Sequence, residues 1–140
     1  MSSNLNYDLV CLTTAITRPE LHTKVLSIIP SFLENYKCKW IIRIDNTNEN
    51  LAEDTKTNFK NILSHPNIDL QIDISNNSCS RMSWYKSVRY CIEQGYKYKS
   101  KFGYFWLEDD WSLNSTTKLN KYLKSYVDKS NYFISLADRQ

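Results

Sequence analysis

Three consecutive carboxylates, Glu108, Asp109 and Asp110, follow the apolar run 104–107. Because desolvating a carboxylate is costly, these acids should emerge where the run leaves the core. Three clustered acids repel one another unless a cation lies among them, and oxygen ligands of this kind suit Mg²⁺ or Mn²⁺. Asp110 and Glu108 are the expected metal ligands, because alternate residues project to the same side if the strand conformation persists. The alternative is an acidic loop that merely follows a core strand.

Two other apolar runs also end in polar residues. The run 40–45 ends in Asp45, and the run 7–13 continues into Thr13 and Thr14. Parallel strands present their carboxyl ends at one edge of a sheet, where open α/β folds bind ligands. We therefore expect these side chains to meet the three acids around one crevice. The competing interpretation is that Asp45 caps the loop after it and that the threonines simply end a strand.

The elements that must position these residues follow from hydrophobic periodicity. Strands are predicted at 7–13, 40–45, 70–74, 104–107 and 132–136, and helices at 19–36, 51–63, 81–94 and 115–127. Pro30 should kink the first helix. Gly95 should cap the third helix, whose inward face is expected to carry Met82, Tyr85, Val88 and Ile92.

Right-handed crossovers between these elements predict an α/β fold with a mostly parallel sheet and helices on both faces. Residues 1–140 would form one domain. A strand order of 3-2-1-4 would place a switch point between the first and fourth strands. The glycine-rich fingerprints of dinucleotide-binding folds and P-loops are absent from the sequence.

The composition restricts the classes of partner. A net charge of +3, from 18 basic and 15 acidic residues, is too small to demand nucleic acid or an anionic membrane. The run 96–101, with alternating tyrosine and lysine, is more typical of a solvated connection than of a nucleic-acid site. No stretch is apolar enough for a transmembrane helix, and the amino terminus does not resemble a signal peptide.

The cysteines and histidines are interpreted as structural residues. Cys11 and Cys91 lie in apolar segments and are expected to be buried thiols, and the chain has no C-x-x-C pair. A reduced, cytoplasmic setting is the simplest interpretation. His22 and His65 are far apart in the sequence, so we expect both at the surface or at helix ends and neither as a metal ligand.

Four local features together resemble the GT-A glycosyltransferases, most closely those of family 2. Thr13-Thr14 followed by Arg18-Pro19 is similar to the family's opening strand, polar loop and "RP" helix start. Asp45 stands where the family has "VDDGS", and the loop and helix 76–87 resemble its "N-x-G…ARN" region. Glu108-Asp109-Asp110 takes the place of D-x-D. The resemblance covers nearly all 140 residues and rests on agreement between weak motifs.

The resemblance implies a GT-A, Rossmann-like core that binds a nucleotide-diphospho-sugar. The implied activity is transfer of the sugar from this donor, a UDP-sugar in the first instance, with Mn²⁺ or Mg²⁺ at Glu108 and Asp110. A glycan or a protein would be the acceptor, and no general base is indicated. The residues implied in donor binding are Thr13, Thr14, Arg18, Asp45, Arg81, Lys86, Glu108 and Asp109.

The departures from the family pattern keep other interpretations open. Lys86-Ser87 stands where "RN" is expected, Asp45-Asn46 replaces paired acids, and the acceptor-binding half of a typical enzyme is missing. One alternative is therefore a non-catalytic nucleotide-binding or nucleotide-sugar-binding module of the same fold. Separately, Arg81 is open to the interpretation of a surface residue at a helix end. A response-regulator-like domain is disfavoured, because its acid pair should follow the first strand, where Thr13 and Thr14 stand.

Overall fold

The computed structural model describes residues 6–75 and 81–111, with the backbone alone described for Arg81 and Met82. The described chain has an α/β fold around a four-stranded parallel sheet. The strands lie in the order β4 (Ile68–Ile74), β3 (Cys38–Asp45), β2 (Leu9–Ile16) and β6 (Tyr104–Trp106). This is the 3-2-1-4 order considered from the sequence. A short parallel pair, β1 (Asn6–Tyr7) with β5 (Lys99–Ser100), precedes the amino ends of β2 and β6.

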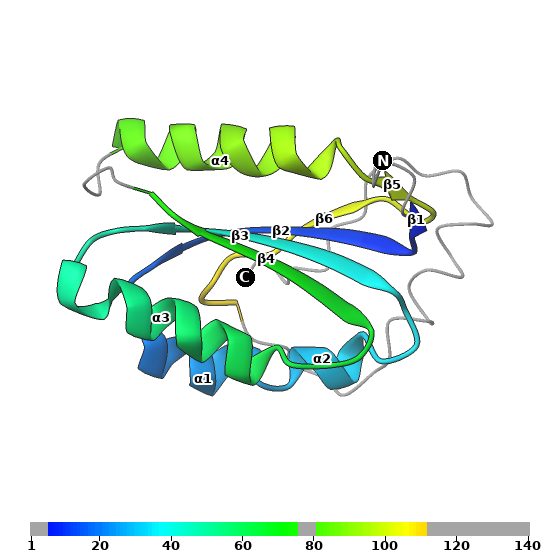
Figure 1. Cartoon of the computed structure of the whole chain (residues 1–140), viewed down its shortest axis with the longest axis horizontal. Coiled ribbons are helices and arrows are strands. Elements are labelled where there is room, and N and C mark those ends of the chain that lie inside the picture. Colours follow the sequence, from blue (N-terminus) through cyan, green and yellow to red (C-terminus); the bar gives the residue numbers. More distant parts are fainter. Residues whose placement is uncertain (1–5, 76–80, 112–140) are drawn as a thin grey trace, which may run out of the picture.

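Helices cover both faces of the sheet, as predicted. The first face carries α1 (Pro19–Leu26), α2 (Ile29–Phe32) and α3 (Glu49–Ile62), and the second carries α4 (Arg81–Gly95) (Figure 1). Right-handed crossovers require this division, because the chain moves outward from β2 to β4 and then returns across the sheet to β6. In the described part of the chain, no helix is long and apolar enough to cross a membrane.

The helix boundaries have local causes. Pro30 breaks the first predicted helix into α1 and α2 and lies in the first turn of α2, where its missing N–H leaves no bond unmade. The helix α3 begins at Glu49, two residues earlier than expected, because the Asn48 side chain accepts a hydrogen bond from the backbone N–H of Asn50 at 3.0 Å.

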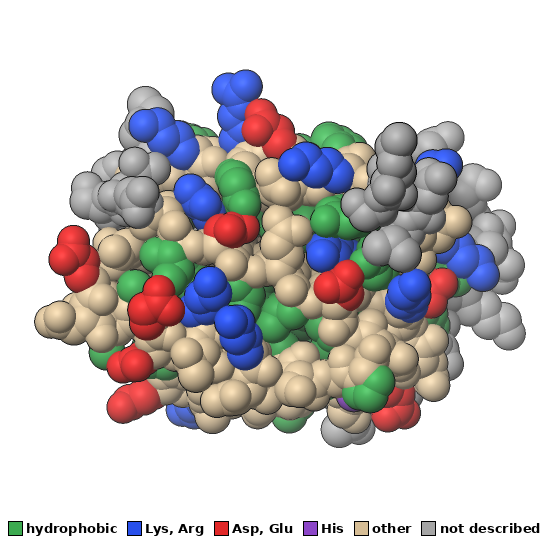
Figure 2. Space-filling view, viewed as in Figure 1, with side chains coloured by type: hydrophobic (Ala, Val, Ile, Leu, Met, Phe, Trp, Pro, Cys, Tyr) green, Lys and Arg blue, Asp and Glu red, His purple; other side chains and the backbone are tan. Residues whose placement is uncertain are grey.

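The core is thickest between the central strands and α1, α2 and α3. Trp40 on β3 and Phe59 on α3 are the largest fully buried side chains. Cys11 and Cys91 are buried thiols, which confirms that prediction. The outer surface is mixed in charge, and basic and acidic side chains are interspersed over the face shown in Figure 2.

The inward face of α4 differs from the prediction. Tyr85 and Ile92, which were expected to point inward, are exposed. The buried positions are instead small and four residues apart: Ser83, Ser87, Cys91 and Gly95. These small residues allow the helix axis to lie close to β2 and β3.

Gly95 is required by this close approach and not by a left-handed cap. Of the two glycines in the chain, Gly103 is the one with a positive φ, at 121°. A Cβ atom at Gly95 would lie 2.9 Å from Cδ2 of the buried Leu12 on β2. Gly95 closes α4, as predicted, but it does so as a contact residue and without a positive φ.

Two strand ends also differ from expectation, and both affect the site. The strand β2 continues to Ile16, so Thr13 and Thr14 lie within it, paired with Ile42 and Arg43. The strand β6 ends at Trp106, so the three acids follow it in a turn. The strand alternation from which Glu108 and Asp110 were paired as ligands therefore does not hold. The predicted helix 115–127 and strand 132–136 lie outside the described residues.

Substitution of Gly95 by leucine should lower the free energy of unfolding by about 1–3 kcal/mol, as overpacking generally does. The new side chain would push α4 away from Leu12. Chemical denaturation would measure the loss. The neighbouring exposed Tyr96, changed to leucine, is the control and should shift stability by no more than about 0.5 kcal/mol. Equal stabilities of the two variants would contradict the close approach.

Candidate functional site

A cavity of about 130 Å³ lies at the carboxyl edge of the sheet. Its lining comes from the end of β2, the end of β3, the start of α4 and the turn after β6: Thr14, Ala15, Ile16, Arg18, Asp45, Trp84, Glu108 and Asp109. The strand order reverses between β2 and β6 at this place, since the chain runs from β2 outward to β4 before it reaches β6. Ligands of open α/β folds bind at such switch points.

Asp109 is the anchor of the site, and its side chain is 5% exposed. Its carboxylate accepts hydrogen bonds from the Ile16 backbone N–H at 3.2 Å, from Arg18 Nε at 2.9 Å and from Arg18 Nη2. His22 Nε2 lies 2.7 Å from the same carboxylate. Burial acts to raise the pKa of Asp109, but the hydrogen bonds from His22 and Arg18 outweigh it and lower this pKa to about 2. Asp109 is thus a charged structural group.

Local sequence explains how Arg18 and His22 reach one carboxylate. Pro19 disfavours the helical conformation for Arg18, whose backbone has φ −139° and ψ 65°, so α1 starts directly after it. His22 lies one helical turn beyond Arg18 and is fully buried, stacked on Phe59 with ring centroids 4.4 Å apart. His22 thus lies near the start of α1, as the helix-end alternative had it, but it is buried, so the surface alternative is wrong. Since a carboxylate only accepts hydrogen bonds, the shared proton lies on His22 Nε2.

Asp45 is also buried, and hydroxyl groups from two elements hold it. Ser75 Oγ, just after β4, donates to Asp45 Oδ1 at 3.3 Å, and Ser87 Oγ on α4 donates to the same oxygen. The small inward face of α4 is what brings Ser87 to the end of β3. Asp45 also lines the cavity, so it joins α4 to the sheet while it borders the site.

The other two acids are less constrained. Glu108 lines the cavity, and its Oε1 accepts a hydrogen bond from Trp106 Nε1 at 2.7 Å. The side chain of Asp110 is 48% exposed and lies 3.5 Å from Arg18 Nη2. Among the described residues, no group of three or more His, Cys, Asp or Glu side chains converges on one point. Two carboxylates by themselves do not complete the coordination of Mg²⁺, which usually keeps several waters and takes further oxygens from a phosphate.

The structure brings five of the predicted site residues, Thr14, Arg18, Asp45, Glu108 and Asp109, to the cavity and places Thr13 and Lys86 away from it. Thr13 is buried away from the cavity and accepts a hydrogen bond from Trp40 Nε1 at 2.9 Å. Lys86 is exposed on α4 and does not line the cavity. Arg81 begins α4, but its side chain lies outside the described part of the chain. The roles of Lys86 and Arg81 in binding a diphosphate stay predictions.

Sequence reasoning missed Trp84 and His22. Trp84 lines the cavity from the first turns of α4. A signal existed for it, because the small residues Ser83, Ser87 and Cys91 recur every four positions and place Trp84 beside the buried face. His22 lies four residues after Arg18, a spacing at which two side chains can reach the same acceptor.

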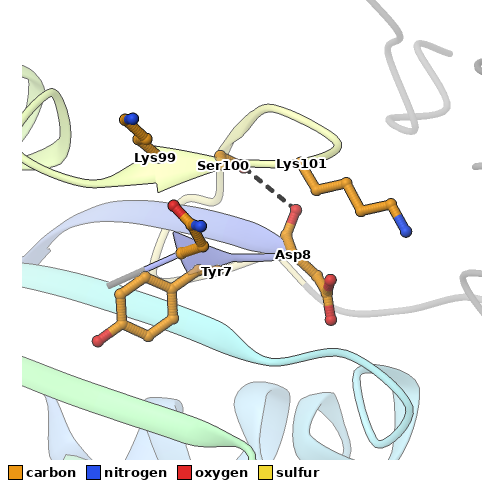
Figure 3. Close-up of a pocket in the computed structure, with 6 residues that line it drawn as sticks. Tyr7, Asp8, Lys99, Ser100 and Lys101 are labelled. Carbon is orange, nitrogen blue, oxygen red and sulfur yellow. Dashed lines mark hydrogen bonds between the residues drawn. The ribbon is translucent and has the colours of Figure 1, made fainter. Parts of the chain in front are cut away.

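A larger cavity, of about 360 Å³, lies at the opposite end of the sheet between β1 and β5 (Figure 3). The side chain of Tyr7 points from there toward β4 and donates to Asp69. The Asp8 carboxylate accepts from the backbone N–H of Lys37 at 2.9 Å, and Ser100 Oγ donates to the Asp8 carbonyl at 3.1 Å. Because its one carboxylate already has a partner and no second acid lines it, this cavity lacks the acid cluster of the first.

No family model matches the chain, and no curated protein or solved structure matches it significantly. The structure itself supports an α/β, Rossmann-like topology with acids at the switch point. The resemblance to GT-A glycosyltransferases therefore stays a prediction.

Asp109→Asn should remove a pH-dependent part of the stability. The folded-state pKa of about 2 lies below the ordinary value of 3.8, so the charged carboxylate stabilises the fold above about pH 4 and this contribution is lost as pH falls toward 2. Its size is about 2 kcal/mol. Urea denaturation between pH 7 and pH 2.5 should show the stability difference between wild type and Asp109→Asn shrinking with acid.

Asp110→Asn is the matched control, because the half-exposed Asp110 has one long contact to Arg18. At neutral pH it should lose less than about 1 kcal/mol, as for surface ion pairs. A stability difference for Asp109→Asn that does not vary with pH would show that Asp109 is not the charged anchor.

Proposed function

We propose that the chain is the donor-binding part of a glycosyltransferase with a GT-A-type core, which transfers a sugar from a nucleotide-diphosphate donor. The observation that carries the proposal is the meeting of Thr14, Asp45 and Glu108 around one cavity at the switch point of a parallel sheet. The motifs that resemble the family supply three of the strand ends concerned. A UDP-sugar is the first donor to test.

Each residue of the site would contact a different part of the donor. Asp45 would accept from a base N–H or a ribose hydroxyl, and the backbone at Thr14 would offer further polar contacts. Arg18, whose side chain is 32% exposed, has the charge to bond a diphosphate oxygen while it stays fixed on Asp109. Trp84 would form an apolar wall for the ligand. Lys86 and Arg81, both on α4, would add charge-assisted hydrogen bonds to the diphosphate if their side chains extend to it.

Mn²⁺ or Mg²⁺ is the proposed cofactor, held by Asp110 and Glu108 together with oxygens of the diphosphate. When bound, the ion supplies positive charge against the charge that develops on the leaving nucleoside diphosphate. Asp109 is not proposed as a ligand, because its oxygens already accept bonds from Ile16, Arg18 and His22. An ion that arrives with the donor also agrees with the partial neutralisation of these acids by Arg18.

Calorimetry and thermal-shift measurements with UDP, GDP, CDP and their sugars, each with Mn²⁺, Mg²⁺ or EDTA, test the proposal. One nucleotide should bind only with metal and, at 100 times its Kd, should stabilise the protein by about 2.7 kcal/mol. Asp110→Ala should abolish this metal-dependent shift, because it removes a proposed ligand without touching the anchor. Asp54→Ala, on the exposed side of α3, should retain it. Failure of every nucleotide with every metal would sink the proposal.

The second candidate is a non-catalytic nucleotide-binding or nucleotide-sugar-binding module of the same fold. It rests on the same cavity of about 130 Å³ and, unlike transfer, requires no general base. Donor turnover separates the two candidates. Metal-dependent binding with no release of sugar, even beside a range of acceptors, would favour the module.

A further inference from the structure

Trp84, on α4, lines the cavity at the carboxyl edge of the sheet and is 41% exposed. A single exposed aromatic side chain is ordinary on a protein surface. Trp84 differs in its position, because it is the aromatic member of a cavity lining whose other described members, apart from Ile16, are small, polar or charged. Sites for small molecules commonly combine an aromatic wall with a few convergent polar groups. The exposed indole is therefore available to a ligand in this cavity.

The contact between α4 and β3 places Trp84 beside Asp45. Ser87, three residues after Trp84, donates a hydrogen bond from its Oγ to Asp45 Oδ1. Side chains three residues apart are neighbours on a helix surface, so the indole and the Asp45 carboxylate border the same part of the cavity. Proteins read a nucleobase by stacking an aromatic side chain on its flat face and by hydrogen bonds to its edge. The indole and the carboxylate supply these two kinds of contact.

The other charged groups of the site lie on other elements. Arg18 precedes α1, and Glu108 and Asp110 follow β6. Under the proposed function these groups hold the diphosphate and its cation. A diphosphate joins the ribose and base on one side to the sugar on the other. A base that reaches Asp45 at the end of β3 would therefore also reach Trp84.

Tyr85 restricts the orientation of the indole. The ring of Tyr85, the next residue in the chain, lies against that of Trp84 with centroids 5.1 Å apart and planes inclined by 56°. Tyr85 is itself 54% exposed, so the pair lies outside the core. A side chain whose rotation is already restricted loses less conformational entropy when a ligand packs on it. The contact thus prepares the indole for stacking.

We propose that Trp84 is the platform on which the nucleobase of the donor stacks, with the edge of the base toward Asp45. The inference rests on the proposed function, since it requires a nucleotide in the cavity. It adds the requirement that the ligand carry a base, because inorganic pyrophosphate would lack this contact. Stacking does not by itself select among bases, since each has a π face. Hydrogen bonds to Asp45 would make that choice.

Calorimetry on the full chain with UDP, GDP, CDP and inorganic pyrophosphate, each with Mn²⁺, tests the inference. The wild type should bind at least one of the nucleotides more tightly than it binds pyrophosphate. Trp84→Leu keeps an apolar wall but removes the flat ring. It should weaken binding of that nucleotide by about 5- to 150-fold, the range expected for a base stacked on an aromatic side chain. The same variant should bind pyrophosphate as the wild type does, because the phosphate contacts are intact.

Trp84→Phe and Tyr96→Leu are the matched variants. Phenylalanine retains a ring for stacking, so Trp84→Phe should bind the nucleotide more tightly than Trp84→Leu. Tyr96 is 72% exposed beyond the end of α4 and lies outside the cavity lining. Tyr96→Leu should therefore leave the binding of both ligands unchanged. Retained binding of pyrophosphate also shows that each variant is folded.

Three results would overturn the inference and leave a cation-dependent site in place. In the first, Trp84→Leu binds the nucleotide as tightly as the wild type. In the second, Trp84→Leu loses affinity equally for the nucleotide and for pyrophosphate, which would show that Trp84 only shapes the cavity. In the third, the wild type binds pyrophosphate as tightly as any nucleotide. Absence of binding of every ligand to the wild type would instead remove the proposed function, and the inference with it.

Discussion

The buried carboxylate of Asp109 is the constraint on which the site depends. It receives the Ile16 N–H at the end of β2, Arg18 at the start of α1 and His22 one turn later. A charge buried this deeply is tolerable only with such partners, because an unpaired carboxylate in the core would cost several kcal/mol. The same bonds fix the turn after β6 against the neighbouring strand, and so they set where Glu108 and Asp110 emerge.

A second buried acid performs the corresponding task on the other side of the cavity. Asp45 ties the end of β3 to Ser75 and to Ser87 on α4. The helix can come this close because its inward positions are small. Further out, the hydroxyl groups of Thr17 and Thr47 join the loops after β2 and β3. The carboxyl edge of the sheet is therefore held together by polar contacts, whereas the middle of the sheet is held by apolar packing.

The three acids divide into one that holds the fold and two that remain available. The negative charge that the cluster presents to an added ligand is therefore smaller than that of three free carboxylates. Arg18 already neutralises part of the charge, so a small ion has little reason to reside there without an anionic ligand to complete its coordination. The donor that we propose would therefore have to bring its own cation, bound to its phosphates.

Much of the fold was accessible to reasoning from the sequence. The strands around Trp40 and Leu12 are nearly continuous apolar runs, which is typical of parallel strands covered on both faces. The strand order 3-2-1-4 was considered from the sequence without being derived, whereas the cover of helices on both faces followed from right-handed crossovers. The helix boundaries were right within a few residues because proline and asparagine act locally. The face of α4 was not predicted correctly, because Tyr85 and Ile92 are more hydrophobic than Ser83 and Ser87, and hydrophobicity alone selected the wrong side.

The sequence by itself indicated that Asp45 and the three acids would gather at the carboxyl edge of a parallel sheet, since strand ends and crossover handedness are local or general properties. Only the tertiary structure decided which acid is buried. Asp109 and Asp110 are chemically identical neighbours, and the choice between them depends on Arg18 and His22, about ninety residues earlier in the chain. The same is true of Gly95, whose need for a hydrogen side chain comes from Leu12 on a distant strand. Contacts between residues far apart in sequence are set by packing, and no local pattern records them.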